Sequence, residues 1–139
     1  AQCDEYFYIK HRKEHRGIGG IFYEKLKPDT FEHGLDLSKK VCEAFINSYT
    51  EIIDKRKGLE FTEREKEFQK FRRGRYVEFN LVYDRGTLFG LQTGGRIESI
   101  LMSLPSDVSW RYKFDESLTE SERNLYTVIK KPKDWINDT

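Results

Sequence analysis

The clearest pattern of apolar and polar positions lies between Leu35 and Arg56. Residues recurring at three- and four-residue steps form one stripe: Leu37, Val41, Ala44, Phe45, Ser48 and Ile52. This spacing predicts a helix with a single buried face. Basic residues at positions 55–57 suit the negative end of the helix dipole, and Gly58 supplies a stop signal.

A second helix is predicted to begin at Thr62, because Thr62 and Glu65 have the spacing of a capping box. Its inward face could continue across Gly74 through the following residues: Phe68, Phe71, Arg75, Phe79 and Val82. Glycine inside a helix costs about 1 kcal/mol relative to alanine, so Gly74 needs a packing reason or marks the helix end. Residues 77–81 also alternate as a strand would, and both interpretations remain open.

The remaining segments are shorter. Residues 3–12 have the pattern of a helix end, the glycines at 17–20 interrupt it, and residues 18–23 predict a short strand closed by Pro28. Residues 119–129 predict a last helix, followed by a closing tail at 132–135.

Between these helices the pattern favours strands. Residues 87–93 and 96–104 predict two strands joined by a tight turn at Gly94-Gly95, although 97–104 would also suit a helix. Residues 108–114 alternate like a further strand. The order of elements predicts one domain over residues 1–139, of the α+β class, with a largely antiparallel sheet covered by helices.

The composition of the chain argues against several classes of function. The net charge is only +1, because Lys+Arg 25 balance Asp+Glu 24, so no global field draws the chain to nucleic acid or membrane. No apolar stretch approaches the ~20 residues of a membrane span, and we expect no integral membrane segment. Cys3 and Cys42 are too far apart to suggest a zinc site and are expected to be free thiols. The chain opens without methionine and has the pattern of a piece of a longer polypeptide.

Two basic clusters near the amino terminus could carry chemistry. His11 and His15 would share one face of a helix and could ligate a metal, or they are part of a charged helix end. Arg12 and Arg16 beside the glycine-rich turn would suit an anion.

Three further clusters contain arginine. Residues 72–76 combine arginines with Tyr76, which fits RNA, phosphate or carboxylate binding, or a surface balanced by nearby glutamates. Asp84-Arg85 lies at a junction between elements and is either reactive or a pair that ties a turn. The exposed amides of Gly94-Gly95 with Arg96 would fit a carboxylate or phosphate.

Long blocks of the chain resemble the oxygen-dependent coproporphyrinogen III oxidases, and specifically their carboxy-terminal half. The blocks are CDEYFYIKHR at 3–12, RGIGG at 16–20, FRRGRYVEFNLVYDRGT at 71–87, FGLQTGGR at 89–96 and ESILMSLP at 98–105, with Asp134-Trp135 at the end. The resemblance spans residues 3–135 and rests on far more than a short motif.

The resemblance implies an oxidoreductase of haem biosynthesis that converts two propionates of coproporphyrinogen III to vinyl groups, giving protoporphyrinogen IX. It implies molecular oxygen as co-substrate, no organic cofactor and an uncertain role for a metal. It also implies a homodimer with no nucleic-acid partner, in the cytoplasm or, for an organellar form, in the mitochondrial intermembrane space.

Residue roles are implied by the same resemblance. Asp84, Arg85 and Arg16 match positions proposed for catalysis or substrate binding, and the turn Gly94, Gly95 and Arg96 matches a substrate-contacting turn. His11 matches a histidine suspected of binding metal. Residues Tyr76 to Arg111 match the region of dimer contacts.

Family members are roughly twice as long, so we expect the isolated 139 residues to be inactive. Two other classes of function remain. An RNA-binding module would use Arg72, Arg73, Arg75 and Tyr76. A truncated paralogue kept as a dimerisation partner would have no need of Asp84, Arg85 and Arg96.

Overall fold

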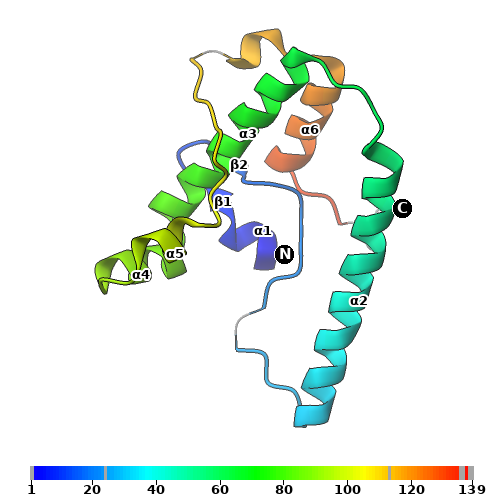
Figure 1. Ribbon diagram of the computed structural model, residues 1–139, viewed down its shortest axis with the longest axis vertical. Helices are drawn as coiled ribbons and strands as arrows, with labels where there is room; N and C mark the ends of the chain where they lie inside the picture. Colours follow the sequence, from blue (N-terminus) through cyan, green and yellow to red (C-terminus); the bar gives the residue numbers. More distant parts are fainter. Residues whose placement is uncertain (1, 24, 113, 135–136, 138–139) are drawn as a thin grey trace. The chain divides into compact units, whose positions relative to one another are not determined.

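The computed structural model describes residues 2–23, 25–112, 114–134 and 137, and helices make up most of it (Figure 1). Its contacts group into two units, Tyr23–Thr62 and the remainder of the chain, and each is described by itself. The elements, in chain order, are α1 (Gln2–Tyr6), β1 (Tyr8–Ile9), β2 (Glu14–His15), α2 (Phe31–Arg56), α3 (Glu63–Val82), α4 (Arg85–Gln92), α5 (Ile97–Leu101), the 3-10 helix η1 (Phe114–Ser117) and α6 (Glu120–Lys130).

The unit Tyr23–Thr62 contains the long helix α2. It begins four residues before the predicted start, because the Thr30 hydroxyl accepts a hydrogen bond from the His33 amide at 3.1 Å and caps the helix. It ends at Arg56, before Gly58, as predicted. The predicted buried face is wrong: no α2 residue is buried, and Phe45 is 63% exposed.

Helix α3 runs without interruption from Glu63 to Val82, so the helical interpretation of residues 77–82 is confirmed. Gly74 lies where an extended segment of the chain crosses the helix. A Cβ at this position would lie 2.8 Å from the Ser109 carbonyl oxygen and 3.3 Å from Trp110 Nε1. Only glycine therefore permits this close crossing, which is the packing reason that the sequence left open.

The crossing segment, residues 105–112, is extended but belongs to no strand, so the predicted strand over 108–112 is wrong. Residue 113 lies outside the described residues. The segment is held to α3 by separate contacts and not by the hydrogen-bond ladder of a sheet. The Ser109 amide donates to the Lys70 carbonyl at 3.1 Å, and the Lys70 side chain pairs with Asp107 at 2.9 Å. Figure 1 shows it (yellow) running beside α3.

The main apolar core lies between α3, η1 and α6. Phe71 stacks on Phe114 with ring centroids 4.6 Å apart, and Tyr126 and Ile129 of α6 complete the cluster. Helix α6 begins at the predicted place, and Thr119 and Glu122 form a capping box.

Residues 85–101 form two short helices instead of the predicted strands, and the helical alternative for 97–104 is confirmed over Ile97–Leu101. The Asp84 carboxylate accepts a hydrogen bond from the Thr87 amide at 2.7 Å, which starts α4. A Cβ on Gly90 would lie 3.0 Å from Ile100, so the glycine lets α5 pack directly on α4.

The amino-terminal segment also differs from its prediction. Helix α1 ends at Tyr6, and a hairpin follows in which Tyr8 pairs with His15 and Ile9 with Glu14. Ile9 is fully buried and therefore anchors the hairpin. Residues 18–23 form neither strand nor helix, contrary to the predicted strand.

The fold is thus compatible with the α+β class, but the prediction of a largely antiparallel sheet is wrong, because two-residue strands form the described sheet. Within residues 87–104, α5 packs on α4 where Ile100 lies close to Gly90. No described helix is long and apolar enough to cross a membrane.

The Gly74 crossing predicts that Gly74→Ala destabilises the protein despite the better helix propensity of alanine. The added methyl must push the Ser109 carbonyl away, and we expect a loss of about 2 kcal/mol in the free energy of unfolding, measured in urea. Gly58→Ala is the matched control, since a Cβ there meets nothing within 4 Å. Equal stability of the two variants would contradict the account.

Candidate functional site

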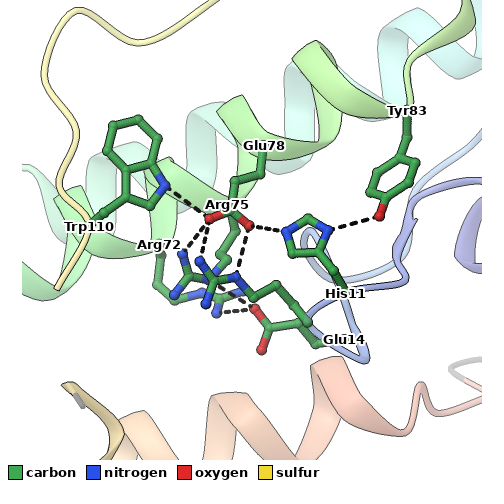
Figure 2. A network of polar contacts seen from close by, with 8 residues as sticks. His11, Glu14, Arg72, Arg75, Glu78, Tyr83 and Trp110 are labelled. Atoms are coloured by element: carbon green, nitrogen blue, oxygen red, sulfur yellow. Dashed lines mark hydrogen bonds and ion pairs between the residues drawn. The ribbon is translucent and has the colours of Figure 1, made fainter. Parts of the chain in front are cut away.

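The carboxylate of Glu78 on α3 accepts hydrogen bonds from three separate segments (Figure 2). From the hairpin, the Arg12 guanidinium donates to both oxygens at 3.0 and 2.7 Å, and His11 Nε2 donates at 2.9 Å. From its own helix Arg75 donates at 3.0 Å, and from the crossing segment Trp110 Nε1 donates at 2.9 Å. The Glu78 side chain is only 12% exposed, so the carboxylate joins these segments where solvent has little access.

A second carboxylate, that of Glu14 on β2, is buried and extends this network. Arg72 donates to it at 2.7 Å, and Arg75 Nε lies 3.5 Å away (Figure 2). Glu14 and Arg75 are each about 4% exposed. Buried charges of this kind are tolerated only when paired, so the two glutamates and the arginines stabilise one another.

The network determines the charge state of Glu78. Burial alone would raise the pKa of this carboxyl, but hydrogen bonds from Arg12 and His11, together with the charge of Arg75, lower it to about 2. Burial lowers the pKa of Arg75, and the charge of Glu78 opposes that shift. Glu78 is therefore ionised at neutral pH and well into the acid range, and its charge holds the hairpin against α3.

The hairpin carries Arg16 to a position over an aromatic ring. The Arg16 amide donates to the Phe7 carbonyl at 3.1 Å, and its guanidinium carbon lies 3.8 Å from the centre of the Phe7 ring and 5.1 Å from that of Tyr76. The side chain is half-buried. Within the part of the chain that the structure describes, no carboxylate pairs with it. A half-desolvated guanidinium of this kind is ready to receive an anion.

A pocket of about 220 Å³ opens beside this guanidinium, between the Gly17–Gly19 backbone and Tyr76. At its wall the Cys3 thiol donates to the Gly19 carbonyl at 3.1 Å, and burial and the nearby Asp4 raise the pKa of Cys3. The volume is below the roughly 300–1,000 Å³ of pockets that enclose a drug-sized ligand. The lining contains both Arg16 and Asp4, and the volume is that of one small polar group of a larger molecule.

Asp84 and Arg85 reach the same aromatic cluster through Tyr6. The Tyr6 hydroxyl donates to Asp84 Oδ1 at 3.2 Å, and the Arg85 guanidinium carbon lies 4.8 Å from the ring centre. The Tyr6 ring in turn meets the edge of Phe7, which carries Arg16. The structure thus brings together three residues that the sequence singled out far apart: Arg16, Asp84 and Arg85.

The glycine turn at 94–95 is confirmed as a tight turn, but it joins two helices. Gly94 has a φ of 72°, and a Cβ on Gly95 would lie 3.0 Å from the Gly90 carbonyl oxygen. Arg96 is exposed at the start of α5. No described contact connects Arg96 with the Arg16 pocket.

The histidines do not share a helix face, because they lie on the hairpin. Both ring nitrogens of His11 are engaged: Nε2 donates to Glu78, and Nδ1 accepts from the Tyr83 hydroxyl at 2.8 Å. His15 Nδ1 donates to the Asp4 carbonyl at 2.8 Å. Among the described residues no three His, Cys, Asp or Glu side chains are grouped for a metal ion. Metal binding by His11 stays a prediction, and it would require one of these hydrogen bonds to break.

The arginines at 72–75 also have a different role from the predicted one. Arg72 and Arg75 pair with Glu14 and Glu78 rather than with the glutamates at 63–67. Only Arg73 of the three is exposed. Glu14 could not be predicted as a partner, since it lies 58 residues from Arg72. The three-residue spacing of Arg75 and Glu78 on one helix was the available signal.

The chain matches the family model of coproporphyrinogen III oxidase over residues 1–135. The match covers the hairpin, the Arg16 pocket and the Asp84–Arg85 junction. The chain belongs to the coproporphyrinogen III oxidase family, whose role is in porphyrin and haem biosynthesis.

The depressed pKa of Glu78 predicts an acid-sensitive stability. The contribution of ionised Glu78 to the free energy of unfolding is fully present above about pH 4.5, where the carboxyl is ionised in both the folded and the unfolded chain. It is lost as the pH falls towards 2. Glu78→Gln should lower the free energy of unfolding by about 3 kcal/mol at pH 7 and weaken its dependence on pH between 5 and 2.

Urea unfolding at several pH values measures this effect. Glu98→Gln, at an exposed position on α5, is the control and should follow the wild type. A Glu78→Gln curve that runs parallel to the wild-type curve across the acid range would show that Glu78 does not carry this linkage.

Proposed function

We propose that this chain supplies the arginine-bearing part of the substrate site of an oxygen-dependent coproporphyrinogen III oxidase. The observation that carries the proposal is Arg16, a half-buried guanidinium over Phe7 that faces a small pocket and has no carboxylate partner among the described residues. The substrate carries four carboxylates, and guanidinium groups pair with carboxylates in a planar, bidentate geometry. The pocket volume suits one propionate of this large ligand.

The proposed reaction consumes one oxygen molecule for each propionate. The carboxylate leaves as carbon dioxide, a hydrogen leaves the carbon next to the pyrrole ring, and a vinyl group remains. The propionate loses two electrons, so atoms and charge balance when oxygen and one proton are converted to hydrogen peroxide. Arg16 and Arg85 bind propionates, with Arg96 as a further candidate, and Asp84 hydrogen-bonds the pyrrole nitrogens or accepts a proton. The proposal needs no organic cofactor and leaves a metal as a separate question.

Asp84 has the capacity for this role. Its two oxygens accept one hydrogen bond each, from the Tyr6 hydroxyl and the Thr87 amide. A carboxylate offers about four lone-pair directions, so it can accept further donors from a ligand. Its position as the cap of α4 keeps it at a rigid helix start.

We further propose that the chain works together with an amino-terminal half as the full-length enzyme, and that this enzyme is a homodimer. The predicted dimer region, Tyr76 to Arg111, exposes several large apolar side chains: Leu81, Val82, Phe89, Leu91, Ile97, Met102 and Trp110. Phe89 is 68% exposed and Met102 79%. Exposed apolar side chains of this size are available for an interface.

Arg16→Ala tests the proposed carboxylate site. We expect the affinity of the chain for coproporphyrin, the stable oxidised form of the substrate, to fall about tenfold, because one charge-assisted pair is lost. Fluorescence titration measures the affinity, and thermal unfolding checks the fold. Arg73→Ala removes an exposed arginine of α3 and should leave the affinity unchanged. Wild-type affinity in Arg16→Ala, or equal losses in both variants, would contradict the assignment.

The dimer proposal predicts that Phe89→Glu shifts the full-length enzyme towards monomer. A charge placed in an apolar interface must be desolvated without a partner, which weakens association strongly. Sedimentation velocity measures the shift. Phe45→Glu, at an equally exposed phenylalanine of α2 outside the region, should not change the oligomeric state. Unchanged sedimentation of Phe89→Glu would place the interface elsewhere.

A further inference from the structure

Tyr6, the last residue of α1, contacts both arginines of the proposed site, directly or through one ring. Tyr6 lies in the block at 3–12 that carries the family resemblance, but the resemblance implies no role for it. Its side chain is only half-buried, and it meets residues almost 80 positions away in the sequence.

The hydroxyl of Tyr6 acts on the Asp84–Arg85 junction. It donates to Asp84 Oδ1 at 3.2 Å, and its own oxygen accepts a hydrogen bond from the Arg85 backbone amide at 3.4 Å. The other carboxylate oxygen, Oδ2, is held by the Thr87 amide at 2.7 Å. With a donor on each oxygen, the plane of the Asp84 carboxylate has a fixed orientation. Loss of the hydroxyl would leave it held at one oxygen only.

The ring of Tyr6 acts on the cations. The Arg85 guanidinium carbon lies 4.8 Å from its centre, within the range of a cation–π contact. The same ring stacks on Phe22 with centroids 4.5 Å apart and meets Phe7 edge-on at 4.8 Å. Phe7 carries the Arg16 guanidinium at 3.8 Å. Arg85 and Arg16 therefore rest on two rings that touch each other.

We infer that Tyr6 is a positioning residue: its hydroxyl orients Asp84, and its ring sets the place of Arg85 relative to Arg16. This inference rests on the proposed function, because it assigns Tyr6 to the groups that would contact the porphyrinogen. A tyrosine that only fills space would affect stability, and turnover would change only as far as the folded fraction changes.

The two parts of the side chain make separate predictions in the full-length enzyme. Tyr6→Phe removes one oxygen and keeps the ring, so kcat should fall about tenfold with KM within twofold, since only the orientation of Asp84 is lost. Tyr6→Leu also removes the ring beneath Arg85, so KM should rise about fivefold in addition. Oxygen consumption, normalised to folded protein by circular dichroism, gives both constants.

Two comparisons separate this inference from the proposed function. Tyr8→Phe removes a hydroxyl for which the described chain contains no hydrogen-bond partner, and it should match the wild type. Asp84→Asn should cut turnover by orders of magnitude. Adding Tyr6→Phe to Asp84→Asn should cause no further fall in kcat, because the hydroxyl acts only through the carboxylate.

Each outcome decides one claim. Three results would overturn the positioning role: wild-type kcat in Tyr6→Phe, a full additional fall of kcat in the double variant, or failure of Tyr6→Phe to fold. The proposed function would still hold in each case if Asp84→Asn turns over slowly. Near-normal turnover of Asp84→Asn would overturn the role of Asp84 in the proposed function, and the role of the Tyr6 hydroxyl with it.

Discussion

The arrangement of the amino-terminal hairpin depends on one partly buried carboxylate, that of Glu78. It accepts five hydrogen bonds, from His11, Arg12, Arg75 and Trp110, and so joins the hairpin and the crossing segment to α3. A buried ion pair gives little net stability compared with an apolar core, but removal of one partner costs about 3–5 kcal/mol because the others remain charged. The hairpin strands pair over only two residues each, so their position depends on this charge and on the buried Ile9.

Arg16 follows the second strand directly, so the network that holds the hairpin also sets the position of the proposed carboxylate clamp. Two populations of arginine result from this arrangement. Arg72 and Arg75 pair with Glu14 and Glu78, whereas Arg16 lies over aromatic rings and no carboxylate among the described residues pairs with it. The partner of each guanidinium, rather than the number of arginines, distinguishes the scaffold from the proposed site.

Helices whose position is determined by local features of the sequence were predicted. Helices α2 and α6 have strong apolar spacing and clear terminal residues, and both were found. The strand over residues 87–93 was mispredicted, and 97–104 was left open between strand and helix, because short apolar runs fit either period. The outcome depended on the Asp84 cap and on glycine contacts between α4 and α5. The sequence singled out Arg16, Asp84 and Arg85 as candidate residues, and their roles stay predictions. That Tyr6 and Phe7 connect them could not be predicted, because these contacts span up to 79 residues of sequence.

The central claim is that the hydrogen bonds and charges around Glu78 keep its carboxylate ionised well below the ordinary pKa of glutamate. An NMR titration of its side-chain carboxyl carbon tests this most directly. The account predicts that the resonance keeps its ionised chemical shift as the pH falls through 4.5, with a midpoint near 2. A midpoint close to 4.5, the ordinary value for glutamate, would show that Arg12, His11 and Arg75 do not hold the carboxylate as described and would contradict the account.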